Sequence, residues 1–158
     1  MTGHHTSKNL ANEISNIARE WEITDKILLI VSDNASNIKG AIMNELNLKH
    51  FGCFAHTLNL IVNHSLDIPE ILSLLAKVRK VVAHFKRSAL ANEHIMKYQE
   101  NMGNAPLKVL QDVATRWNST YYMLERFLLL ENALKSTIAI LNKDIPILSG
   151  EEWKYVSI

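Results

Sequence analysis

Apolar residues recur along the first third of this chain with spacings that predict one helix and one strand. Between Leu10 and Trp21 they fall on one stripe of a helix, and Thr6 or Ser7 is suited to cap its start. Residues 26–32 then form a short apolar run between polar residues, which predicts a strand buried on both faces. A helix followed by such a strand favours an α/β fold over a helical bundle.

Further helices are expected downstream, with at most one more strand. The expected elements are a helix at 37–46 capped by Ser36, a short strand or extended turn at 50–55, and helices at 56–66, around 71–85 and from 118 to about 141. A Gly, an Asn and a Pro within 102–106 predict a break, and 108–115 reads as irregular. Ser149 and Glu152 have the spacing of a capping box for a last short helix.

Composition narrows the class of protein only slightly. A length of 158 residues suits one compact domain, and a hydrophobic fraction of 47% excludes intrinsic disorder. A single cysteine excludes a disulfide framework. The 17 basic and 16 acidic side chains nearly balance, so net charge gives no indication of nucleic-acid binding.

Neither a targeting segment nor a membrane span is predicted. Residues 1–10 are polar, unlike a signal peptide. The longest apolar runs, at 27–31 and 127–130, are far shorter than the roughly 20 residues that cross a bilayer. A membrane is therefore not expected among the partners.

Asp33 is the sharpest candidate for chemistry. It directly follows the predicted strand, and the carboxyl ends of strands in α/β folds face the crevice where ligands bind. A carboxylate there is a natural ligand for Mg²⁺ or Mn²⁺. The alternative is a turn residue that accepts hydrogen bonds from its own backbone. A two-metal site needs further acids, and none lies close by in the sequence.

Cys53 and His56 form a CxxH pair. With His50 or His64 it could be half of a zinc site, although structural zinc usually takes four ligands from two clear pairs. The favoured interpretation is a packed cysteine beside a histidine at a helix start, where the histidine donates to a phosphate or to Asp33. A thiol nucleophile remains a weaker alternative, because no cysteine-protease signature surrounds Cys53.

Arg116 and Trp117 combine a planar cation with an aromatic platform at a helix start. Such a pair can hold a phosphate and an unstacked base. An arginine stacked on the tryptophan, or a buried tryptophan that anchors the helix, would explain the same residues. Asp112 and Glu125 are interpreted as a turn residue and a solvent-facing residue. A further basic set either faces solvent or follows a phosphate backbone: Lys77, Arg79, Lys80, Lys86 and Arg87.

Three motifs occur together in a recognisable order. They are the strand and turn at 27–37, the CxxH segment at 53–60, and the segment 112–121 around Arg116 and Trp117. Together they closely resemble the hAT-superfamily transposases, and most closely the transposase-derived proteins with zinc finger BED domains. The resemblance covers nearly the whole chain.

This resemblance implies an RNase H-like catalytic core with a large helical insertion, in which two Asp and one Glu bind two divalent metals for DNA cleavage and strand transfer. Asp33 matches the second Asp. Cys53 and His56 match the CxxH motif, and Arg116 with Trp117 matches the Arg–Trp pair that opens the insertion. Trp117 would then stabilise an unstacked base during hairpin formation.

The other two acids of such a core have no match here. The chain is therefore expected to be an internal fragment, inactive alone, with a partial RNase H-like core at 1–66 and a helical insertion at 67–158. The complete parent would bind DNA and Mg²⁺ or Mn²⁺, self-associate and act in the nucleus. The first alternative is a non-catalytic nuclear DNA-binding regulator that keeps the scaffold. A helical interaction module that binds neither DNA nor metal is the second.

Overall fold

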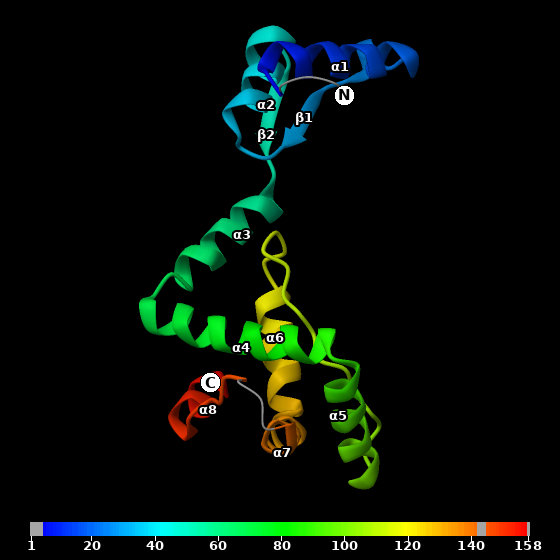
Figure 1. Ribbon diagram of the computed structural model, residues 1–158. Coiled ribbons are helices and arrows are strands. Elements are labelled where there is room, and N and C mark those ends of the chain that lie inside the picture. Colours follow the sequence, from blue (N-terminus) through cyan, green and yellow to red (C-terminus); the bar gives the residue numbers. More distant parts are fainter. Residues whose placement is uncertain (1–4, 142–144, 158) are drawn as a thin grey trace. The chain divides into compact units, whose positions relative to one another are not determined.

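The computed structural model describes residues 5–141 and 145–157, which divide into two compact units, Met1–Leu60 and Ile61–Ile158 (Figure 1). The first unit contains α1 (Ser7–Glu20), a 3₁₀ turn (Thr24–Lys26), β1 (Leu29–Ser32), α2 (Ser36–Gly40), a π-helical turn (Ala41–Glu45) and β2 (Lys49–Gly52). Helix α3 (Phe54–Ser65) starts in the first unit and ends in the second. The expected mixture of helix and strand is confirmed, with helix predominating.

The first unit is built around a two-stranded parallel sheet. The strands pair in register from Leu29 opposite Lys49 to Ser32 opposite Gly52. Parallel strands need a crossover connection, and α2 with the π-helical turn provides it. Thr6 caps α1 as predicted, because its side chain accepts a hydrogen bond from the Asn9 N–H at 3.3 Å.

Two predictions for the first unit are wrong. The strand is not buried on both faces, since Leu29 and Val31 are 47% and 57% exposed. Ile30 and His50, which alternate with exposed residues along the two strands, are half-buried, and the π-helical turn contacts β2. Ser36 does not cap α2 either. Ala35 has the extended backbone of the N-cap position, and its side chain makes no capping hydrogen bond.

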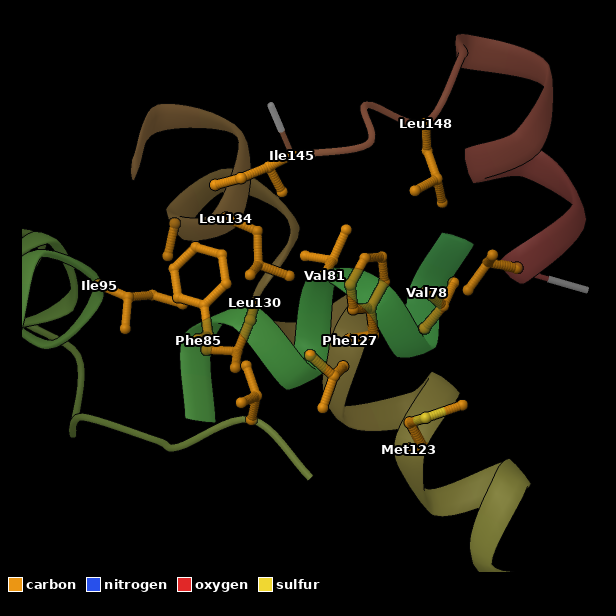
Figure 2. Packing of buried hydrophobic residues seen from close by; sticks show 14 of the residues in the cluster. Val78, Val81, Phe85, Ile95, Met123, Phe127, Leu130, Leu134, Ile145 and Leu148 are labelled. Carbon is orange, nitrogen blue, oxygen red and sulfur yellow. The ribbon is translucent and has the colours of Figure 1, made fainter. Parts of the chain in front are cut away.

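The second unit is helical and contains a contiguous hydrophobic core. It comprises the end of α3, then α4 (Pro69–Arg87), α5 (Ala89–Asn101), α6 (Ser119–Leu129), α7 (Glu131–Leu141) and α8 (Gly150–Val156). Figure 2 shows Val81 and Phe85 of α4 close to Phe127 of α6 and Leu134 of α7. These four side chains are at most 1% exposed.

The helical periodicity of 71–85 is confirmed by α4, and the capping box of Ser149 and Glu152 by α8. The single helix expected from 118 to 141 is instead two helices, broken at Leu130. Helix α3 is confirmed, although its expected inward residue Ile61 is 58% exposed. The break at 102–106 is confirmed too, with Gly103 at a φ of 72°.

Candidate functional site

Asp33 directly follows β1, where the sequence places it. Its side chain is exposed, and Oδ1 accepts a hydrogen bond from the Ala35 N–H at 3.2 Å. It lines a pocket of about 360 Å³ together with His5, Ser32 and Asn37. The Asn37 side chain closes one wall by donating to the His5 carbonyl at 3.0 Å. The carboxylate therefore faces a pocket while it also stabilises its own turn.

The parallel register brings Cys53 to the same end of the sheet. Because Ser32 lies opposite Gly52, the next residues on the two strands are Asp33 and Cys53. The Cys53 N–H extends the pairing by donating to the Ser32 carbonyl at 2.7 Å. A side chain on Gly52 could not fit easily, since its Cβ would lie 3.0 Å from Asn34 Oδ1.

His56 lies in the first turn of α3, which opens beside Cys53. The Cys53 carbonyl accepts hydrogen bonds from the Thr57 N–H at 3.1 Å and from the Thr57 hydroxyl at 3.2 Å. Cys53 is a free, half-buried thiol, and His56 is half-buried as well. The pair thus sits at a helix start, where positive partial charge favours an anion.

The described residues do not make up a metal centre. Among residues 5–141 and 145–157, no three His, Cys, Asp or Glu side chains converge closely enough to hold an ion. Asp33 offers oxygen of the kind that Mg²⁺ accepts, but a two-metal site needs several converging carboxylates. No catalytic step through a metal follows from these residues.

Arg116 and Trp117 lie in the turn before α6, in the second unit. Trp117 is 46% exposed and is not part of the hydrophobic core. Arg116 is exposed, and in the described part of the chain the cation–π contact is a different one, between Lys135 and Trp153. Neither a buried anchor nor an arginine–tryptophan stack therefore accounts for this pair.

Ser119 closes the turn that presents Trp117. Its hydroxyl accepts from the Val113 N–H at 2.9 Å and lies 2.8 Å from the carbonyl oxygens of Val113 and Arg116. The Arg116 N–H donates to the Val113 carbonyl at 2.9 Å as well. A compact set of local hydrogen bonds thus holds the exposed tryptophan in place.

Asp112 anchors the same segment to the rest of the helical unit. Its carboxylate accepts hydrogen bonds from Arg79 of α4 at 2.6 and 2.8 Å, from Thr120 of α6 at 3.3 Å and from the neighbouring Gln111 at 2.8 Å. Burial of the Asp112 side chain raises its pKa. The hydrogen bonds and the Arg79 charge together lower the pKa by more than burial raises it, so the pKa lies below its ordinary value.

Sequence reasoning missed this role. The sequence predicts only a turn residue at Asp112, because Arg79 lies 33 positions away along the chain and leaves no local signal. Glu125 is exposed as expected, but it also accepts a hydrogen bond from the Tyr121 hydroxyl at 3.0 Å. The Glu125 contact raises the pKa of Tyr121 above its ordinary value.

Two further aromatic residues open α6 beside Trp117 in the sequence. Tyr121 and Tyr122 are 62% and 49% exposed, and their rings meet edge to face with centroids 5.5 Å apart. Exposed aromatic rings provide stacking surfaces for bases. The start of α6 therefore carries an arginine and three exposed aromatic side chains on a braced turn.

Comparisons with known proteins identify the family to which this chain belongs. Residues 51–158 match the family described as the ZBED1 RNase-like helical domain. A putative AC transposase of Zea mays is 31% identical over 96% of this chain and 21% of its own length. The human zinc finger BED domain-containing protein 4 is 29% identical over 80% of this chain and 11% of its own length.

A putative transcriptional regulator of Talaromyces stipitatus, tpeD, is 25% identical over 99% of the chain and 23% of its own length. No match was found among solved structures. The chain spans less than a quarter of the length of these relatives. It belongs to the ZBED1 RNase-like helical domain family, which confirms the resemblance to transposase-derived proteins with BED zinc fingers.

The described helices offer no membrane span, since none of them is both long and apolar enough to cross a bilayer.

Proposed function

We propose that this segment of a hAT-type transposase, or of a transposase-derived protein, binds DNA and holds an unpaired base against Trp117. The observation that carries the proposal is the exposure of Trp117 on a turn braced by Ser119 and Asp112. Bases stack on exposed aromatic rings, and Trp117, unlike the exposed Trp21, follows an arginine and precedes two exposed tyrosines. Arg116 is placed beside it to contact the backbone phosphate.

Asp33 has a separate role in this proposal. In the complete protein it would be one ligand of a Mg²⁺ or Mn²⁺ ion in an RNase H-like core, and a pair of such ions supplies charge stabilisation for phosphodiester cleavage and strand transfer. Its position at the carboxyl end of β1, beside a pocket, supports this role. Residues 1–66 would belong to that core and residues 67–158 to the helical insertion.

Cys53 and His56 would contact the DNA near the same strand end. The half-buried His56 lies in the first turn of α3, and in this proposal its ring would donate to a phosphate or to the Asp33 carboxylate. The complete protein would self-associate and act in the nucleus, where its DNA lies. The names of the relatives, transposases and BED zinc finger proteins, support this proposal.

A binding experiment on the 158-residue chain tests the Trp117 role. Two labelled duplexes, identical except for one unpaired base, are titrated and followed by fluorescence anisotropy. Because stacking contributes about 1–3 kcal/mol per base, Trp117→Ala should weaken binding to the unpaired-base duplex by about 5- to 150-fold. Binding to the fully paired duplex should change little, since it offers no unstacked base.

The matched control is Trp21→Ala, which removes another exposed tryptophan, 72% accessible, from the first unit. It should leave both affinities unchanged. Equal affinity of wild type and Trp117→Ala for the unpaired-base duplex would refute the stacking role, and no binding of either duplex by the wild type would refute DNA binding altogether.

A second candidate function is that of a non-catalytic DNA-binding regulator, in which Asp33 only stabilises its turn. The hydrogen bond from the Ala35 N–H to Asp33 supports this candidate. Asp33→Ala in the complete parent protein separates the two. In a nuclease it should abolish Mg²⁺-dependent cleavage with DNA binding retained. In a regulator the parent shows no cleavage to lose.

A further inference from the structure

The basic residues of α4 divide into two groups. Lys77 Nζ lies 2.5 Å from Glu152 Oε1, and Arg79 is paired with Asp112 at 2.6 Å. In the part of the chain that the structure describes, Lys80 and Arg87 have no ion pair. The first two cations thus hold the helical unit together, whereas none of the carboxylates that the structure describes neutralises Lys80 or Arg87.

Lys80 and Arg87 line the same pocket. Together with His84 they occupy one face of α4, at spacings of four and three residues, so the three side chains project over the same two turns. The pocket has a volume of about 490 Å³, and its other walls include Ser88, Ile145 and Pro146. No described residue that lines it is acidic. Two cationic side chains in the lining, with no described acidic residue beside them, attract a compact anion.

His84 adds an independent observation. Its ring Nε2 is enclosed and, within the described residues, has no hydrogen-bond partner. The ring is held edge to face against Phe85, with centroids 5.9 Å apart. An enclosed polar atom without a partner is destabilising, and it is satisfied when an acceptor oxygen reaches it. An anion oxygen is the acceptor that a pocket of this charge attracts.

The favourable interaction of cations with the negative end of the α4 dipole does not explain why the basic side chains line this pocket. Cations near a helix C-terminus are favourable, which explains exposed Lys86 as well as Arg87. It does not explain why Lys80, two turns before the end, faces the same cavity. One carbonyl at the C-terminal end of α4 is also satisfied within the chain, because the Ser88 N–H donates to the His84 carbonyl at 2.9 Å.

We infer that this pocket binds a phosphate group of a DNA backbone, with Lys80 and Arg87 as the charged contacts and His84 as a donor between them. The inference rests on the DNA binding proposed above and adds a second contact surface to it. A phosphate fits because its oxygens accept from all three side chains, and Arg87 can hold two of them at once. Such a contact positions DNA without reading its sequence.

The experiment compares two double variants of the 158-residue chain on one fully paired, labelled 20-base-pair duplex over a series of KCl concentrations. Lys80→Gln with Arg87→Gln removes the pocket charges. Lys86→Gln with Lys97→Gln removes the same charge from exposed positions outside the pocket. The pocket variant should lower the slope of log K against log salt by about 1 and weaken binding by about 5- to 10-fold near 0.1 M salt. The control pair should change the affinity by less than about twofold.

The Trp117→Ala variant and a titration with inorganic pyrophosphate separate the possible failures. If wild type binds no duplex, both the proposed function and this inference fail. If wild type binds DNA, and only Trp117→Ala affects recognition of an unpaired base while the two double variants match each other, the pocket inference alone is overturned. A third outcome is that the pocket variant loses pyrophosphate binding while both double variants bind the duplex equally. It would assign the pocket to small phosphates and overturn the DNA contact.

Discussion

The three tryptophans of the chain occupy three different environments. Trp153 is 7% exposed, stacks on Phe127 with centroids 4.9 Å apart and lies under the Lys135 ammonium. Trp117 is 46% exposed on its turn, and Trp21 is 72% exposed at the C-cap of α1. A stacked, buried ring contributes to folding, whereas Trp117, exposed next to Arg116 on a hydrogen-bonded turn, is available for binding.

The first prediction contrasts two of these rings. Trp153→Ala should reduce the free energy of unfolding by about 3–5 kcal/mol, because it leaves a cavity in the core of the helical unit. Trp117→Ala should change it by less than about 0.5 kcal/mol. Urea unfolding followed by circular dichroism measures both values. A large loss of stability in Trp117→Ala would show that this ring is structural and would remove the basis for its binding role.

The second prediction concerns the pH dependence that Asp112 confers. Its pKa is lower in the folded chain than its ordinary value, so its contribution to stability is complete above that value and is lost as the pH falls through the folded pKa. Asp112→Asn should therefore destabilise the chain by about 1–2 kcal/mol at pH 7. Below about pH 4 the difference from wild type should shrink, since Asp112 binds a proton there in the unfolded chain first and, at still lower pH, in the folded chain as well.

Unfolding in urea at pH 7 and at pH 3 measures this difference, with Glu93→Gln as the control because Glu93 is exposed. A penalty for Asp112→Asn that is equal at both pH values would mean that the charge of Asp112 does not matter.

At the scale of elements, periodicity predicted the helices and caps that depend on local sequence. It failed for the helix boundary that tertiary packing determines. Helix α4 and the capping box of α8 follow from spacing alone. The break between α6 and α7 at Leu130 does not, since no Gly or Pro occurs from 118 to 141. Leu130 is 2% exposed, so its burial in the core accompanies the change of helix direction, and no local pattern contains that information.

The candidate site shows the same division. The position of Asp33 at a strand end follows from the apolar run before it. Its proximity to Cys53 requires the register of β1 on β2, and the anchoring of Asp112 requires the packing of α4 near α6. Local sequence therefore predicts which side chains are candidates, but not which of them the fold brings together.

The third prediction concerns the exposed face of the sheet, which the apolar run at 26–32 predicted to be buried. Val31 and Phe51 are cross-strand neighbours and are 57% and 62% exposed. Exposed apolar strands with open edges associate, so the isolated chain should be poorly soluble. Val31→Lys should raise the soluble monomer fraction, measured by size-exclusion chromatography with light scattering.

The matched control is Leu129→Lys, at an apolar position in the second unit that is 68% exposed. A wild-type chain that stays monomeric and unfolds sharply and reversibly would contradict this account of the sheet face.

At the scale of the whole molecule, the two compact units carry different parts of the proposed chemistry. The first contains Asp33, Cys53 and His56, and the second contains Arg116 and Trp117 with the basic pocket of α4. In the proposed transposase the first would contribute to cleavage and the second to holding the DNA. The family match covers the whole of the second unit and the last residues of the first. The central claim is therefore that the helical unit contacts DNA through Trp117.

One measurement tests that claim most directly. Trp21→Phe and Trp153→Phe together leave Trp117 as the only tryptophan, with an aromatic ring kept against Phe127 in the core. The emission of Trp117 is then followed during titration with a duplex that has one unpaired base and with its fully paired counterpart. Stacking of the base should quench the emission with the unpaired-base duplex only. Binding of that duplex without any change in Trp117 emission would contradict the account.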